Sequence, residues 1–200
     1  MSVRVRICIS KKRASNLCMM NRRSILTITL FGTLWGAIEA SLGTILHMFR
    51  LPFSGSILSG LGLIILLYVR KEMNIRGSAI LMGLVAGTIK MISFSTVKFG
   101  PFTGIVMEGV IVEIVMILLG PTKFGFFLSG IFTGIYPIVQ NIFVKTVLFG
   151  MKFVPVLIEL ADGISKSVGF GLGWWILIFY LVSHILFGCI AAWAAWIIIK

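Results

Sequence analysis

Residues 25–47 form a largely apolar run of 23 residues that contains a single carboxylate, Glu39. A helix needs about 20 apolar residues to cross a hydrocarbon core of ~30 Å, so this run predicts a membrane-spanning helix. Small residues recur on one side of that helix, and at about 100° per residue Glu39 falls within the same arc. A charge on the close-packed face of a membrane helix is costly unless it has a partner or faces a polar cavity. We therefore expect the rest of the chain to supply such a partner.

The whole chain shares this apolar character. It has 200 residues, of which 58% are hydrophobic and 12% are charged, whereas soluble domains average about 25% charged residues. The sequence therefore predicts an all-α integral membrane protein. The formal net charge is +12, but seven of the 18 basic residues lie in the first 23 positions and others flank apolar runs. This pattern favours membrane topology and anionic lipid, and not nucleic acid, as its explanation.

Breaks in the apolar runs divide the chain into six predicted spans. Gly-Pro pairs at 100–101 and 120–121 and a basic turn at 70–76 mark three of the boundaries. A basic tail over 1–24 precedes one six-helix domain over 25–200, and its first apolar run is too long for a cleaved signal peptide. Residues 151–171 are predicted as a loop with room for a short amphipathic helix. The spans are 25–47, 54–69, 77–96, 102–119, 124–149 and 172–199.

The distribution of basic residues predicts the orientation of the bundle. With the N-terminus inside, 12 of the 18 basic residues lie in inner segments and four in outer segments. Inner loops carry the excess of Lys and Arg, so we expect a plasma-membrane protein with both termini cytoplasmic. At ~1.5 Å per residue, Glu39 and Lys90 then both lie about 20 Å from the inner surface. Opposite charges at one depth predict an ion pair between the first and third spans.

Other polar residues of the spans gather in the same outer half, which predicts a cavity for a small-molecule substrate. Pro137 frees a carbonyl beside two of these polar residues. The predicted binding residues are Glu39, Lys90, Glu108, Gln140, Asn141 and His184. The alternative is that the Glu39–Lys90 pair only fixes helix packing. Glu113 lies about 9 Å from the inner surface at the same rise per residue, and we expect it to snorkel or to pair with Lys123.

Three further features bear on function. The three cysteines lack metal-site spacing, so no metal site or cofactor is predicted. The tryptophans, Trp35 among them, mostly fit interfacial belts. The chain has no H-E-x-x-H or G-x-S-x-G motif and no G-x-x-x-x-G-K-[ST] loop. We therefore expect no enzymatic activity, and any energy for transport must come from an ion gradient or a separate subunit.

Three local strings carry a family resemblance: G-x-L-W-G-A-I-E at 32–39, L-P-F-S-G at 51–55 and G-P-x-x-G-I-V-x-E at 100–108. With six helices in 200 residues, they resemble the substrate-binding S components of energy-coupling factor transporters. The resemblance implies uptake of a small organic, vitamin-like solute together with a transmembrane coupling subunit and ATPase subunits. It also implies a partner-subunit face on the first helix at Gly32, Gly36 and Ala40, although Glu39 beside them departs from the family pattern.

Two other functions remain open at this point. A stand-alone proton-coupled carrier would use Glu39 or Glu108, but carriers are usually built from internal repeats and this chain shows none. A membrane scaffold or assembly protein would need no ligand at all.

Overall fold

A computed structural model describes residues 22–49, 54–92, 99–148, 150, 152–168 and 175–199. Most of the predicted basic tail, as well as Trp174 and Lys200, therefore lies outside the described residues. Described secondary structure is helical throughout. The helices are α2 (Arg22–Met48), α3 (Ser54–Met73), α4 (Ser78–Ile92), α5 (Phe99–Leu119), α6 (Lys123–Phe143) with the π-helical turn η1 (Val144–Leu148), α7 (Phe153–Val168) and α8 (Trp175–Ile198).

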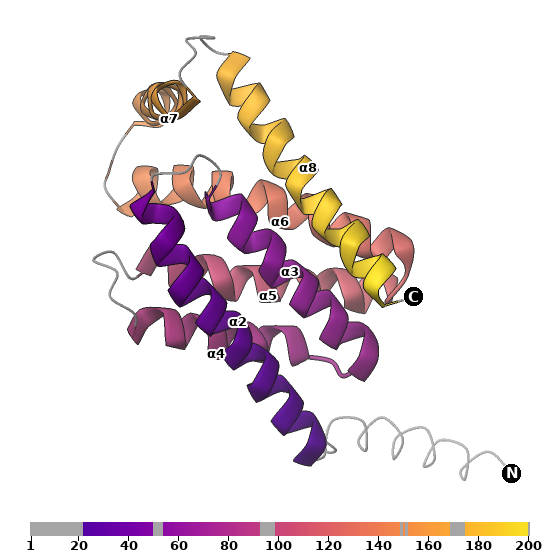
Figure 1. Ribbon diagram of the computed structural model, residues 1–200. Helices are drawn as coiled ribbons and strands as arrows, with labels where there is room; N and C mark the ends of the chain where they lie inside the picture. The colour runs from indigo at the N-terminus through magenta and orange to yellow at the C-terminus, as the bar shows by residue number, and fades with distance from the viewer. Residues whose placement is uncertain are drawn as a thin grey trace, which may run out of the picture.

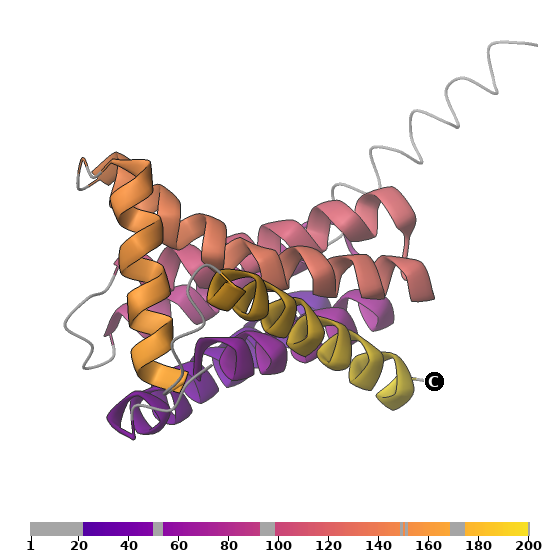
Figure 2. The ribbon, with the colours of Figure 1, turned by 90° about the horizontal axis from the view of Figure 1, so that it is seen from above.

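Six of these helices form two layers of three that cross each other (Figures 1 and 2). One layer places α3 between α2 and α8, and the other places α5 between α4 and α6. Across the layers, α2 packs on α4, α3 on α5 and α8 on α6. The central position of α3 explains why much of the buried apolar surface comes from this helix. The seventh helix, α7, lies across one end of the bundle.

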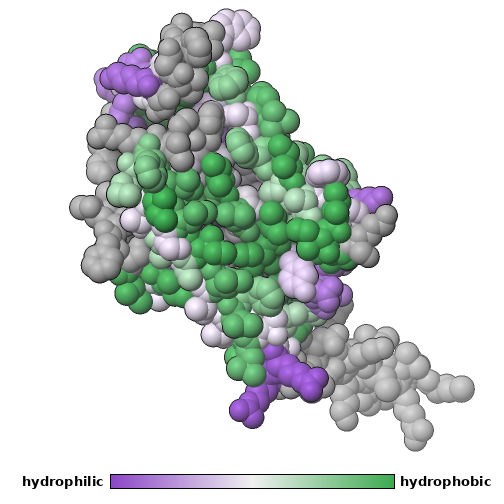
Figure 3. All heavy atoms as spheres, in the orientation of Figure 1, coloured by the Kyte–Doolittle hydropathy of each residue, from purple (hydrophilic) through white to green (hydrophobic). Residues whose placement is uncertain are grey.

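In the part of the chain that the structure describes, five helices are long and apolar enough to cross a membrane: α2, α3, α5, α8, and α6 together with most of η1. Large apolar side chains are exposed on the outside of the bundle, including Leu30, Phe132 and Leu186. Figure 3 shows the resulting apolar band across one face, with hydrophilic residues toward its margins. Burying such a surface in hydrocarbon is favourable, so the protein is a membrane-embedded helical bundle.

Several helix boundaries depart from the sequence prediction: α2 begins at Arg22 and α5 at Phe99, each three residues before its predicted start. The described part of α4 is Ser78–Ile92, and the predicted end of this span at 96 lies outside the described residues. α3 continues to Met73, four residues beyond its predicted end, and so carries Arg70 into the bundle. Within the predicted 151–171 loop, the helix for which the sequence left room is present as α7, which covers most of the segment, exposes Val154 and Ile158 and buries Val156.

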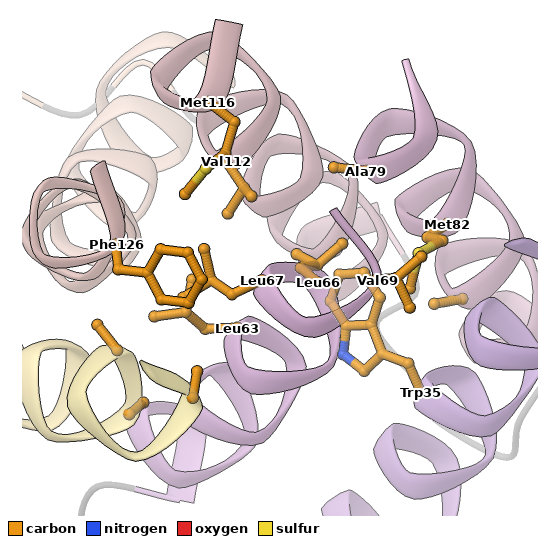
Figure 4. Close-up of a cluster of buried hydrophobic side chains, with 14 of the residues drawn as sticks. Trp35, Leu63, Leu66, Leu67, Val69, Ala79, Met82, Val112, Met116 and Phe126 are labelled. Carbon is orange, nitrogen blue, oxygen red and sulfur yellow. The ribbon is translucent and has the colours of Figure 1, made fainter. Parts of the chain in front are cut away.

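A dense apolar core fills one half of the bundle (Figure 4). It is built around Leu63, Leu66 and Leu67 of α3, none of which is exposed. Trp35 of α2 is also fully buried here, so its assignment to an interfacial belt was wrong. Its indole packs against Gly62, where any side chain would collide with the ring. The remaining fully buried members include Met82, Val112 and Phe126.

Glycine pairs bring the helices of this bundle into close contact. Gly130 of α6 and Gly188 of α8 lie so close that a Cβ on either would collide with the backbone of the other. Close backbone approach of this kind increases the packing contact between helices in hydrocarbon, where no hydrophobic effect drives association. The α6–α8 contact is accordingly one of the most extensive in the molecule.

Candidate functional site

The other half of the bundle contains a cavity of about 200 Å³ between the two layers. It lies where α3 and α5 begin and where α4 ends. Pro101, Ile105 and Leu58 provide apolar walls, and Ser59, Thr133 and Tyr136 bring hydroxyl groups. Four predicted binding residues also line it: Glu39, Lys90, Glu108 and Gln140. A cavity with a few polar groups among apolar walls is the usual form of a small-molecule site.

The predicted ion pair between α2 and α4 is confirmed. Lys90 Nζ lies 3.6 Å from Glu39 Oε2, and both residues are only 6% exposed. The Lys90 ammonium also donates a hydrogen bond to the backbone carbonyl of Glu39. Gly43, one turn after Glu39, leaves room for it, since a Cβ there would lie 2.5 Å from Lys90 Nζ. The two charges therefore compensate each other at the cavity wall.

Glu108 of α5 is the third charged residue of the cavity, and it has no charged partner among the described residues. The side chain is 6% exposed, and its Oε1 atom accepts no hydrogen bond from the described part of the chain. Ser59 lies within hydrogen-bonding reach of the carboxyl group. A buried carboxylate without compensation is costly. Such a group in a cavity points to a ligand, an ion or a proton that completes the site.

Gln140 occupies the side of the cavity where α6 approaches the start of α5. Its amide nitrogen donates to the Gly100 carbonyl and to Thr103 Oγ1, both at 2.7 Å. Gly104 permits this approach, because a Cβ there would lie 3.2 Å from Gln140 Oε1. One turn before Gln140 along α6, Pro137 has no N–H to donate to the carbonyl of Thr133, and both residues line the cavity.

A second, more open hollow of about 330 Å³ adjoins the cavity and shares Gly100, Pro137 and Gln140 with it. Asn141 and Lys145 line this hollow and not the cavity. Lys145 of η1 forms an ion pair with Glu159 of α7 at 2.9 Å, which connects α7 to η1. Asn141 therefore belongs to the approach to the cavity, and its predicted place inside the cavity was wrong.

His184 also lies outside the cavity. It is 4% exposed, and one of its ring nitrogens hydrogen-bonds to the hydroxyl of Ser56, 3.1–3.2 Å away. Its ring also packs edge-on against Tyr180, with centroids 4.3 Å apart. These contacts lie at the junction of α3 and α8. His184 lines a small hollow there that shares Ser59, Thr133 and Pro137 with the cavity, so it is a neighbour of the cavity and not one of its lining residues.

The small-residue face of α2 is covered by the protein itself. A Cβ on Gly36 would lie 2.9 Å from Ile89 Cβ, and one on Gly32 would lie 3.0 Å from Val85 Cβ, both on α4. Ala40 on the same face is half-buried. The prediction of a partner-subunit face at Gly32, Gly36 and Ala40 was therefore wrong, because α4 occupies that face. The opposite side of α2, including Leu34 and Ser41, is exposed.

Sequence reasoning missed a buried ion pair at the far end of the bundle. Arg70 Nε lies 3.3 Å from Glu113 Oε1, with the two residues 3% and 1% exposed. Glu113 also accepts hydrogen bonds from the backbone N–H groups of Gly77 at 2.7 Å and Ala79 at 3.1 Å. Snorkelling or pairing with Lys123 was therefore the wrong prediction for Glu113. The Glu39–Lys90 pair was predicted by comparing the depths of opposite charges. The same comparison would have paired Arg70 with Glu113 if Arg70 had been assigned to the helix and not to a turn.

Fold and site together define a class: a helical membrane protein with a polar cavity between its helices. Comparison with protein-family models, with curated proteins and with solved structures finds no match for this chain. The resemblance to S components of energy-coupling factor transporters therefore stays a prediction.

Proposed function

We propose that this protein is the membrane-embedded binding subunit for uptake of a small organic solute, which it holds in the cavity between its two layers. The observation that carries the proposal is Glu108, a buried residue that lines a cavity of about 200 Å³ and whose carboxyl Oε1 atom has no hydrogen-bond partner in the described part of the chain. An unpartnered buried carboxyl group does not help the helices to pack. Groups that destabilise the fold in this way are often found in binding sites.

The proposal includes six spans, with α4 as the third. At 1.5 Å per residue the 15 residues of α4 cover about 22 Å, and α2 and α5 both pack against it. The turns after α3 and α5 come together with the C-terminal end of α8. Lys71 and Lys123 both lie over the ring of Trp196, at 4.5 and 5.8 Å. A basic end of this kind favours a cytoplasmic location for both termini in the plasma membrane.

Transport itself requires partners in this proposal. The sequence has no nucleotide-binding loop, so separate coupling and ATPase subunits would supply the energy. The family resemblance supports this arrangement. A coupling subunit would need a surface other than the α4-covered face of α2, and the exposed apolar sides of the bundle offer one. Transport of solute by the reconstituted protein alone would support the stand-alone carrier instead.

The test blocks the cavity without disturbing the core. Gly55 lines the cavity, and a Cβ added there meets nothing within 4 Å. Gly55→Phe should therefore fold, yet should abolish co-purification of any small molecule detected by mass spectrometry with the wild-type protein. Gly163→Phe is the matched control, because Gly163 is equally open but lies on α7 away from the cavity. Equal recovery of the molecule from both variants, or none from the wild type, would favour a scaffold.

A further inference from the structure

The chemistry of the cavity wall identifies the kind of solute that fits it, and this inference rests on the proposed function. Among the described residues that line the cavity, only Glu39, Lys90 and Glu108 carry charge. Lys90 and Glu39 compensate each other. The lining therefore has one uncompensated carboxyl group, Glu108, and no uncompensated cation.

Several hydrogen-bond donors of the described lining are already engaged inside the protein. The Lys90 ammonium forms an ion pair with the Glu39 carboxylate and donates a hydrogen bond to the Glu39 backbone carbonyl. The amide nitrogen of Gln140 serves Gly100 and Thr103. The hydroxyl group of Thr133 donates to the Ser129 and Gly130 carbonyls, at 2.8 and 3.2 Å.

Acceptors, by contrast, are left over. Glu108 Oε1 has no partner in the described part of the chain. The carbonyl of Thr133 lacks the N–H that residue 137 would normally donate, because that residue is proline. Binding of an anionic ligand would be unfavourable, because the Glu108 carboxylate would repel it and several donors of the lining already bond to other groups of the protein. A ligand with positive charge and N–H groups would instead find an acceptor in Glu108 Oε1.

We propose that the cavity binds a small organic ammonium compound, with its N–H groups directed at the Glu108 carboxylate and its apolar part against Leu58, Pro101 and Ile105. Hydrogen bonds between charged groups are roughly twice as strong as neutral ones, and they strengthen when water is excluded. The carboxylate therefore selects for the cation, while the apolar walls select for an organic molecule over a hydrated metal ion. The hollow lined by Asn141 provides the route of entry.

The experiment compares three probes of one shape and different charge: benzylammonium, benzyl alcohol and benzoate. Binding to the full-length protein in detergent is measured from the ligand-dependent shift in unfolding temperature over a millimolar titration. We expect benzylammonium to bind at least tenfold more tightly than the other two. Glu108→Gln, which keeps the shape and removes the charge, should abolish that preference. Glu72→Gln is the control, since Glu72 is exposed and lies at the opposite end of α3.

Each outcome has a separate meaning. If benzoate or benzyl alcohol binds as tightly as benzylammonium, or if Glu108→Gln keeps the preference, the ammonium inference is wrong. A Glu108 that holds a proton has no charge to attract the cation, and would give the first of these results. If such binding is still lost in Gly55→Phe, the cavity binds solutes and the proposed function stands. If no probe binds and no molecule co-purifies with the protein, the proposed function itself is contradicted.

Discussion

Replacement of Glu113 by glutamine should destabilise the protein more than the same replacement of Glu39, although both residues form buried ion pairs. Glu113 uses both carboxylate oxygens: one accepts from the Gly77 N–H and faces Arg70 Nε, and the other accepts from the Ala79 N–H. Glutamine keeps one oxygen and replaces the other with an NH₂ group. That group is a donor placed against another donor, so at least one of these contacts is lost.

The structure also sets the expected magnitudes. Arg70 is 3% exposed, and Asn74 Oδ1, at 3.2 Å, is a neutral acceptor. Removal of its carboxylate partner leaves a buried charge uncompensated, which costs about 3–5 kcal/mol. In Glu39→Gln, the Lys90 charge stays better compensated than the Arg70 charge does in Glu113→Gln. Lys90 keeps its hydrogen bond to the Glu39 backbone carbonyl, and it lines a cavity large enough for water. We expect Glu39→Gln to cost about 1–3 kcal/mol for that reason.

Equilibrium unfolding in mixed micelles, monitored by tryptophan fluorescence, measures both differences in the free energy of unfolding. Glu72→Gln serves as the control and should leave the midpoint unchanged, since Glu72 is exposed. The reasoning is refuted if Glu113→Gln costs no more than Glu39→Gln, because the number of contacts and their burial would then not determine the loss.

Two further predictions test helix packing and orientation. Gly36→Leu should destabilise the α2–α4 contact by about 1–3 kcal/mol, because its Cβ alone would lie 2.9 Å from Ile89 Cβ. Ala37→Leu on the exposed side should be near neutral in the same unfolding assay, and equal losses would contradict the packing. In intact cells, a cysteine at Asp162 should react with an impermeant label and one at Arg76 should not. The reverse pattern would overturn the proposed orientation.

Some features of the molecule follow directly from local sequence. An apolar run of sufficient length predicts a membrane helix. Backbone N–H and C=O groups in hydrocarbon need hydrogen-bond partners, and a helix supplies them within the segment itself. Depth along a helix also follows from sequence, because the rise per residue is constant. This is why Lys90 was correctly matched with Glu39, and why Glu108 and Gln140 were predicted near them.

The ends of the helices and their rotation about their own axes are harder to predict from sequence. A charged residue near a boundary is compatible with either a turn or a helix. Arg70 illustrates the first difficulty: its charge suggested a basic turn, but Glu113 holds it inside the bundle. His184 illustrates the second. It lies at a depth similar to that of the cavity residues, yet the rotation of α8 directs it to Ser56.

The sequence by itself determined the helical membrane class and the level of each polar group along its own helix, because these depend on residue type and a fixed rise along one helix. Only the tertiary structure decided which faces meet. Packing of α4 on α2 covered Gly32 and Gly36. The two layers brought four of the predicted polar residues to one cavity and left Glu108 Oε1 without a partner among the described residues. These outcomes depend on side-chain fit between helices far apart in the chain, and no local pattern encodes that fit.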